Sequence, residues 1–297
     1  MYTLLVPIVI FAVYLLFLRG LELSMVQNLL AEWGLSAEIL SDALLQKQIE
    51  TLIDSWMLSG ILALSTVTVA LQTNTVFVED KQNGVNRDFV SSPIPKNILI
   101  ASYFFYNFLV SAMICLAFLI VCLIYLACTF EFVLSFFSVL FVLVVTFFAT
   151  VTSTLITIFI CSFVKTEGTM MGIVAIFSTA IGFLIGAYMP LSMMPAFAQG
   201  ICGFIPASYA CSLLRYAFLE TPMARLIAYA AEIGLPDGMV AELAKSFGYE
   251  LNLFGWTMTP QWQAVVLAAF ILLFAGLNIG VGKKLSEVLG IGRKKRR

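Results

Sequence analysis

The residue types on which most enzymes rely are scarce in this sequence of 297 residues. Histidine is absent, so the chain holds neither a histidine-based catalytic triad nor a histidine-liganded zinc site. The phosphate-cradling loop GxxxxGK(S/T) is also missing. The six cysteines never form a CxxC pair and are typical of small apolar residues that pack helices: Cys115, Cys122, Cys128, Cys161, Cys202 and Cys211. We therefore predict a chain that is not an enzyme and carries no catalytic residue, cofactor or metal of its own.

One polar island separates two long apolar runs, at VFVEDKQNGVNRDFVSSPIPKNILI, residues 76–100. An asparagine can cap a short helix here, and Pro93 can end it because the residue before proline is pushed out of the helical region. Within that helix Phe89 lies beside Arg87 and Asp88. A protruding aromatic residue with flanking charges is typical of a protein-docking site. The spacing of these residues is also compatible with an alternative, an ordinary cytoplasmic loop whose charged side chains extend into water.

A second unusual stretch, residues 168–214, contains no charged residue. It is long enough for two crossings, but a second crossing would place the basic C-terminal tail outside the cell. Prolines and glycines divide residues 189–219 into two pieces of about a dozen residues, each reaching about half the bilayer thickness as a helix. The breaks are Pro190, Pro195, Gly200, Gly203 and Pro206. We predict a re-entrant helical hairpin at residues 190–219 on the outer side, with a kinked surface loop as the alternative.

The amino-acid composition indicates whether these segments lie in water or in a membrane. Hydrophobic residues make up 61% of the chain and charged residues 11%, against about 45–50% and about 25% in soluble domains. Apolar runs long enough to cross a bilayer occur near residues 3–18, 56–78, 98–127, 132–164, 169–189 and 262–282. The first run lacks the basic start and cleavage site of a signal peptide. We predict an all-α polytopic membrane protein with six transmembrane helices, and with the hairpin between helices five and six.

Charge asymmetry predicts the orientation. Residues 283–297 hold seven basic residues and one acidic residue, whereas the loops at 21–55 and 220–261 together hold eleven acidic residues and three basic ones. Basic residues collect on the cytoplasmic side, so the tail and the island face the cytoplasm and the acidic loops face outward. Six spans then place both termini in the cytoplasm, with the chain in the plasma membrane.

The predicted spans contain no Asp, Glu, Lys, Arg or His. Ion-coupled carriers usually need such a group at membrane depth, so this mechanism is disfavoured, although a sodium site built from hydroxyl groups stays open. A structural or regulatory membrane protein also stays open. Transport assays with and without ATP distinguish these alternatives from ATP-driven transport.

The island and the broken segment together resemble the membrane subunit of ABC transporters of the type-2 permease family, which includes drug, antibiotic, polysaccharide and lipid exporters. In that family the second span ends in an acidic residue and runs into a coupling helix with a glycine and a terminal Ser-Pro. Glu79, Gly84, Ser92 and Pro93 match these positions.

The fifth span of that family ends in Gly-x-aromatic-x-Pro, followed by a second proline, Pro-x-Ser/Thr-Tyr and an arginine. The matching residues are Gly186, Tyr188, Pro190, Pro195, Pro206, Ser208, Tyr209 and Arg215. The likeness covers residues 56–219 in order and spacing. It departs at the start, where the family usually has a basic amphipathic helix and this chain is already apolar at residue 3.

The resemblance implies a single type-2 transmembrane domain, residues 1–297, that pairs with a second copy or a related permease. Two cytoplasmic ATPase subunits, carrying ATP and Mg²⁺, would grip the coupling-helix loop at 79–97, with Asp88 and Phe89 as docking contacts. The hairpin would form the outer gate, with Arg215 at the outer headgroups. The expected cargo is hydrophobic or amphiphilic, as in a multidrug or antibiotic exporter or a lipid-like export system, and the other contacts are membrane lipid and no nucleic acid.

The outer segments carry two helical patterns. Leu45, Ile49, Leu52 and Trp56 recur at spacings of four, three and four, which predicts an amphipathic helix entering the second span. Residues 236–248 predict a second short helix between a proline and a glycine.

Overall fold

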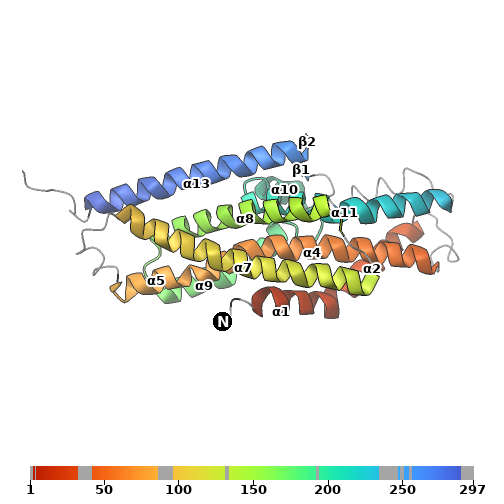
Figure 1. The fold of residues 1–297 in the computed structure, drawn as a ribbon, viewed down its shortest axis with the longest axis horizontal. Helices are drawn as coiled ribbons and strands as arrows, with labels where there is room; N and C mark the ends of the chain where they lie inside the picture. Colours follow the sequence, from red (N-terminus) through yellow and green to blue (C-terminus); the bar gives the residue numbers. More distant parts are fainter. Residues whose placement is uncertain are drawn as a thin grey trace, which may run out of the picture.

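The computed structural model describes the chain except residues 1–2, 4, 33–41, 86–95, 131–133, 192–193, 234–246, 248–250, 254–255 and 289–297. Its helices lie side by side in an elongated bundle (Figure 1). They are α1 (Leu5–Val13), the π-helical turn η2 (Tyr14–Leu18), α2 (Arg19–Glu32), α4 (Ala43–Thr73), α5 (Thr75–Gln82), α7 (Lys96–Phe130), α8 (Phe136–Phe163), α9 (Glu167–Leu184), α10 (Ala196–Cys202), α11 (Pro206–Glu232) and α13 (Pro260–Val288).

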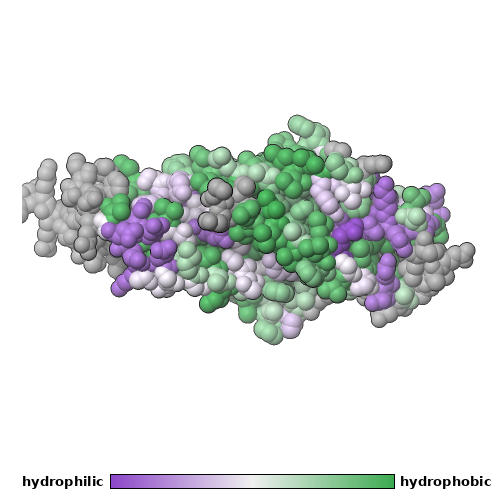
Figure 2. Space-filling view, turned by 90° about the horizontal axis from the view of Figure 1, so that it is seen from below, coloured by the Kyte–Doolittle hydropathy of each residue, from purple (hydrophilic) through white to green (hydrophobic). Residues whose placement is uncertain are grey.

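Six helical segments in the described part of the chain are long and apolar enough to cross a bilayer, which confirms the prediction of six spans. They are Leu5–Asn28, Ala43–Gln82, Ile98–Phe130, Phe136–Phe163, Glu167–Leu184 and Pro260–Gly280. An apolar band covers the middle of the molecule between more hydrophilic ends (Figure 2). The all-α class holds apart from one small ribbon, in which β1 (Leu251–Leu253) pairs antiparallel with β2 (Trp256–Met258).

The boundaries of the first two spans differ from the predicted ones. The first helical run continues through η2 and α2, and α4 begins at Ala43, so most described residues of the predicted outer loop at 21–55 are helical. For α4 the reason is the amphipathic pattern, because Leu45, Ile49, Leu52 and Trp56 are all buried, as predicted. Asp42 starts this helix by accepting the backbone N–H of Leu44 at 2.7 Å.

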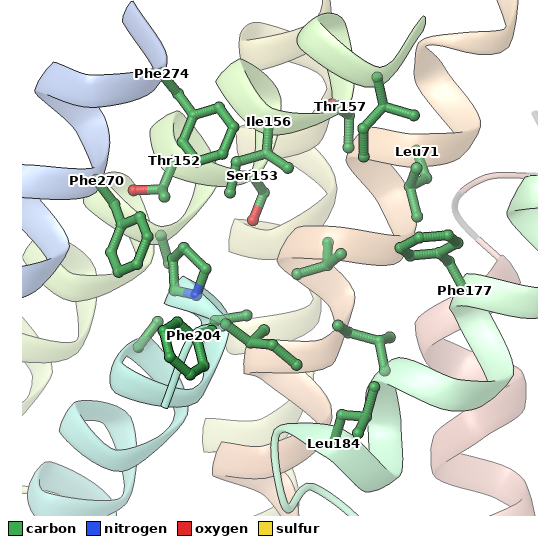
Figure 3. Close-up of a pocket in the computed structure, with 18 of the residues that line it drawn as sticks. Leu71, Thr152, Ser153, Ile156, Thr157, Phe177, Leu184, Phe204, Phe270 and Phe274 are labelled. Carbon is green, nitrogen blue, oxygen red and sulfur yellow. The ribbon is translucent and has the colours of Figure 1, made fainter. Parts of the chain in front are cut away.

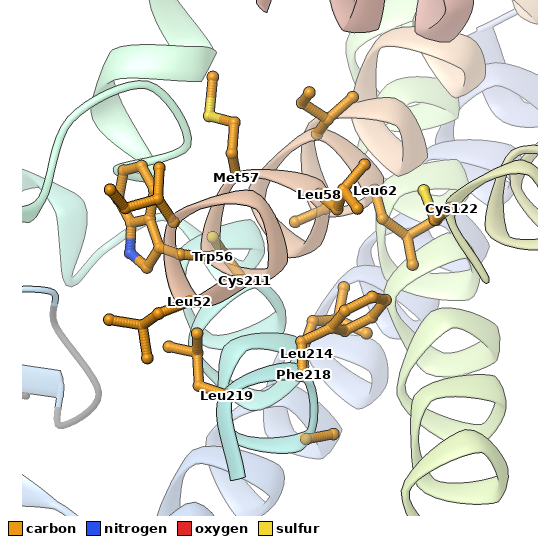
Figure 4. Packing of buried hydrophobic residues seen from close by; sticks show 14 of the residues in the cluster. Leu52, Trp56, Met57, Leu58, Leu62, Cys122, Cys211, Leu214, Phe218 and Leu219 are labelled. Atoms are coloured by element: carbon orange, nitrogen blue, oxygen red, sulfur yellow. The ribbon is translucent and has the colours of Figure 1, made fainter. Parts of the chain in front are cut away.

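Helix α4 forms the centre of the bundle. It packs against α7, α8, α9 and α11, and its residues from Thr51 to Thr66 are buried on every side. Its large apolar side chains interlock with those of α11, where Leu214 and Phe218 are fully buried (Figure 4). Every other helix is therefore positioned through contact with α4 or with one of its neighbours.

The broken segment forms two helices separated at Gly203–Ile205, where the sequence predicted a break. Their lengths were predicted wrongly: α10 has 7 residues and α11 has 27, so α11 extends through Pro222 to Glu232 and into the predicted outer loop at 220–261. Proline costs a helix one hydrogen bond and a steric clash, and the burial of Pro222 against the bundle offsets this cost. The predicted helix at 236–248 lies almost wholly outside the described residues.

Candidate functional site

Two of the predicted coupling residues lie in the described part of the chain. Glu79 is on α5, and its carbonyl accepts the N–H of Asn83 at 2.8 Å. Gly84 follows with a φ of +76°, a left-handed conformation that favours glycine at a helix end. This geometry gives a physical reason for the glycine that the motif contains. Arg87, Asp88, Phe89, Ser92 and Pro93 lie outside the described residues, so the docking contacts stay a prediction.

Helix α5, which leads into the island, is tied to the turn between α8 and α9. Lys81 Nζ donates hydrogen bonds to the carbonyls of Ser162 at 2.7 Å and Val164 at 2.8 Å. These carbonyls lie at the C-terminal end of α8, where backbone acceptors lack helical partners and a cation is favoured. Gln82 Oε1 accepts the N–H of Glu167, the first residue of α9, at 2.6 Å.

A third tie reaches α7. Tyr103 Oη donates to Asp80 Oδ2 at 2.6 Å, and the Tyr103 ring packs edge-on against Phe77 with ring centroids 4.8 Å apart. Helix α5 is thus joined to α7, α8 and α9 through three consecutive residues, 80–82, and the sequence pattern gave no signal for these partners. A displacement of α5 must be shared by three membrane helices.

At the opposite end of α9 the chain makes a tight turn around Gly186. This glycine has a φ of +72°, and the N–H of Ala187 donates to Gly182 at 2.8 Å. A Cβ on Gly60 of α4 would lie 2.9 Å from the Ala187 carbonyl oxygen. The turn therefore packs directly on the central helix without an intervening side chain.

Arg215 holds this turn from the other side. We expected it at the outer headgroups, but this was wrong: its side chain is only 2% exposed. It donates from Nη2 to the carbonyl of Gly186, and its guanidinium lies 4.3 Å from the centroid of the Trp56 ring. A guanidinium that leaves water needs such acceptors and ring faces. The structure brings Gly186 and Arg215 together, and it adds Trp56, which sequence reasoning had taken only as part of a helical face.

The remaining predicted gate residues mark where helices begin and end. Pro190 is buried after the turn, Pro195 directly precedes α10, and Pro206 is the first residue of α11, where proline costs no hydrogen bond. Tyr209 Oη donates to the carbonyl of Gly203 at 2.7 Å across the break between the two helices. These residues shape one continuous segment, and their role as a gate stays a prediction.

A buried charged cluster lies at the α4 N-terminal end of the bundle, which sequence reasoning missed. Asp54 is fully buried and accepts hydrogen bonds from Tyr14, from Arg19 Nε at 3.1 and 3.2 Å, and from Tyr125 at 2.7 Å. Arg19 also pairs with Glu50 at 2.8 Å. The predicted spans ended at residue 18 and began at residue 56, so these charges fell just outside them. The helices continue past those limits and hold the cluster between α4, α7 and the first helical run.

Polar side chains deeper in the bundle are satisfied locally or between helices. Asn74 Nδ2 donates to Thr157 Oγ1 at 2.6 Å, and Asn107 Nδ2 donates to the carbonyl of Ala70 at 2.9 Å. Several hydroxyls bond back to their own helix, as Ser65 does to Ile61 at 2.6 Å. This arrangement joins helices to one another.

An apolar cavity of about 380 Å³ lies between α4, α8, α9, α13 and the junction of α10 with α11. Phe177, Phe204, Phe270 and Phe274 surround it, and its hydroxyl groups come from Thr152, Ser153 and Thr157 on α8 (Figure 3). Ligand pockets for small molecules typically have about 300–1,000 Å³ and predominantly apolar walls. This cavity therefore suits an apolar molecule or the tail of an amphiphile.

Comparison with known sequences places the chain in a family. The sequence model of a family described as ABC-2 type transporter matches residues 1–219. The matched region contains Glu79 and Gly84 as well as the turn at Gly186, and it ends within α11. No curated protein matches the chain at a significant level.

Proposed function

The chain belongs to the ABC-2 type transporter family, and from this premise we propose that it is the permease subunit of an ATP-driven exporter. Its two cytoplasmic ATPase partners would bind ATP and Mg²⁺ and would grip the loop at 79–97. A second copy or a related permease would complete the pathway. Both termini would face the cytoplasm, with the assembly in the plasma membrane.

The observation that carries this proposal is the attachment of α5. Lys81, Gln82 and Asp80 connect the approach to the island with α8, α9 and α7. A push delivered by a soluble ATPase at the island would move these helices together, because each contact is a charge-assisted or short hydrogen bond. The cavity between α4, α8, α9 and α13 would change shape with them.

The cargo class follows from the walls of that cavity. Four phenylalanines and aliphatic side chains line it, and they favour a hydrophobic or amphiphilic molecule such as a drug, an antibiotic or a lipid-like compound. The segment from Gly186 to Arg215 would form the outer gate, since it closes the same region from the other end of α9.

The test is transport by inside-out vesicles from the native host that carry the tagged chain. We expect ATP-dependent uptake of a fluorescent amphiphile, and ATP hydrolysis that co-purifies with the chain. The double variant Asp88→Ala with Phe89→Ala should lose both. The control is Phe137→Ala, which removes an exposed aromatic ring at the start of α8 and should change neither.

Two other functions give different results in the same vesicles. An ion-coupled carrier, for which the buried charges around Asp54 would be the candidate site, would take up cargo without ATP and stop when the sodium gradient is collapsed. A structural or regulatory protein would leave uptake unchanged on deletion. Gradient-driven uptake that survives the double substitution would rule out the proposal.

A further inference from the structure

A second cavity, of about 550 Å³, lies between the first helical run and the end of α9. Its walls are formed by aliphatic side chains such as Ile10 and Val13 and by Phe183, Tyr188 and Pro190. Val13 and Met189 at its edge are 45% and 39% exposed, so the cavity opens where the described surface is apolar. Glu22 is the one charged residue in its lining.

The carboxylate of Glu22 is unusual because both oxygens are buried and neither has a hydrogen-bond partner among the described residues. Asp54, the neighbouring buried carboxylate, accepts from two tyrosines and from Arg19. A buried carboxylate without a hydrogen-bond partner is unfavourable, because it has lost the water that would stabilise its charge. Such a group inside a membrane helix marks a functional site by default.

Both nearby arginines make other contacts. Arg19 pairs with Asp54 and Glu50. Arg215 is near enough for its charge to interact with that of Glu22, but it donates to Gly186 and lies over Trp56. Arg215 therefore acts on Glu22 only through its charge, and neither Arg215 Nε nor the Glu22 carboxylate has a hydrogen-bond partner among the described residues. The carboxylate is left able to pair with a cation that enters the cavity.

Two further features point to a ligand at this place. The rings of Phe183 and Tyr188 lie edge to face with centroids 5.4 Å apart, and aromatic faces attract organic cations. The π-helical turn Tyr14–Leu18 interrupts the helix one turn before Glu22, and such turns occur frequently at functional sites.

We propose that this cavity binds a lipophilic organic cation, whose charge pairs with Glu22 and whose apolar body packs against Ile10, Val13 and the aromatic pair. The Glu22 oxygens are covered in this structure, so binding requires the flexible side chain to turn toward the cavity. As a statement about cargo class the idea rests on the proposed function, but the binding itself does not.

The test uses tetraphenylphosphonium as the cation and tetraphenylborate as an anion of matched size. Equilibrium dialysis of the purified full chain in detergent should show at least tenfold tighter binding of the cation. Glu22→Gln, which keeps the shape of the side chain, should weaken binding of the cation by at least tenfold. Glu50→Gln removes a carboxylate from the neighbouring cluster around Asp54 that does not line the cavity, and it should change cation binding less than twofold.

A second variant separates shape from charge. Val13→Trp fills the cavity and should abolish binding of the cation even though Glu22 is retained. Equal binding of the two ions, or unchanged cation binding in Glu22→Gln, would overturn the inference. Because the assay contains no ATPase, its failure would leave ATP-driven export of uncharged cargo intact, and a failure of the proposed function would leave this binding measurable.

Discussion

At the turn after α9, the structure explains why the type-2 permease motif contains a glycine and an arginine. Gly186 adopts a φ of +72° and its carbonyl accepts from Arg215. The glycine is therefore needed for its backbone conformation, and the arginine is needed to satisfy that backbone. The motif contains both residues because they form one structural unit.

Gly186→Ala should destabilise the protein by about 1–2 kcal/mol, because an L-residue is strained in this conformation. The added Cβ would also lie 2.8 Å from Leu191 Cγ. Thermal unfolding of the purified chain in detergent measures the effect. Gly276→Ala in α13 is the matched control, since its Cβ would meet nothing within 4 Å, and it should gain up to about 1 kcal/mol. An equal response of the two variants would contradict this reading.

Sequence reasoning at this scale succeeded where backbone conformation selects a residue type. The glycines at 84 and 186 and the prolines at 195 and 206 lie at helix ends, as their chemistry requires. It failed for Arg215 and Asp54, whose partners lie in other segments far away in sequence. Spacing along one chain carries no information about which distant side chain will satisfy a buried charge.

At the scale of elements, the short helix α5 connects the island to the helix bundle through its hydrogen bonds. Lys81→Met removes two charge-assisted hydrogen bonds to the end of α8, each of about 1.5–3 kcal/mol. Because the loss of these bonds weakens the link between α5 and α8, we expect transport per ATP hydrolysed to fall by about threefold or more. Parallel assays of uptake and ATP hydrolysis in vesicles give this ratio.

The control for that variant is Lys165→Met, which removes an exposed lysine from the adjacent turn. It should leave the transport ratio unchanged. Equal ratios for wild type and Lys81→Met would show that α5 is not needed to transmit the movement.

A contact between α4 and α11 predicts pH dependence. Tyr229 donates to Asp42 Oδ2 at 2.6 Å, and this bond, with the N–H groups of Leu44 and Leu45, lowers the pKa of Asp42. The same hydrogen bond raises the pKa of Tyr229 to about 12. Unfolded aspartate titrates at about 3.9 and tyrosine at about 10.

The contact therefore stabilises the fold fully between those unfolded values. Stability should decline as the pH falls through the lowered pKa of Asp42, and again as it rises from about 10 toward 12 with the ionisation of Tyr229. Melting temperatures measured across this range should show both declines. Tyr229→Phe should reduce both, and a profile identical to wild type would exclude the contact in solution.

The ends of the helices were harder to predict from the sequence than the number of membrane spans. Hydropathy located six spans, but the polar ends of α2, α4 and α11 continue as helices beyond the apolar runs. Helix α4 packs against both α2 and α11, and tertiary packing decides how far a helix continues. The lengths of α10 and α11 were misjudged for the same reason.

On the face shown in Figure 2, an apolar band separates two ends that are more hydrophilic. At one end α4 begins and α11 ends, and at the other α5 meets the turn between α8 and α9 (Figure 1). The proposed docking at the island requires that second end to face the cytoplasm. Orientation is therefore the property of the whole chain on which the mechanism depends.

Cysteine labelling measures that orientation directly. Of the six cysteines only Cys128 is exposed, so Cys128→Ser supplies a background in which the remaining thiols are buried. Into it we would place Lys47→Cys near the start of α4 or Thr166→Cys before α9, both at exposed positions. A membrane-impermeant maleimide should label the first variant in intact cells and the second only after permeabilisation. The reverse pattern would place the island outside the cell, where no ATPase could drive it, because the energy of hydrolysis enters only from the side that holds ATP.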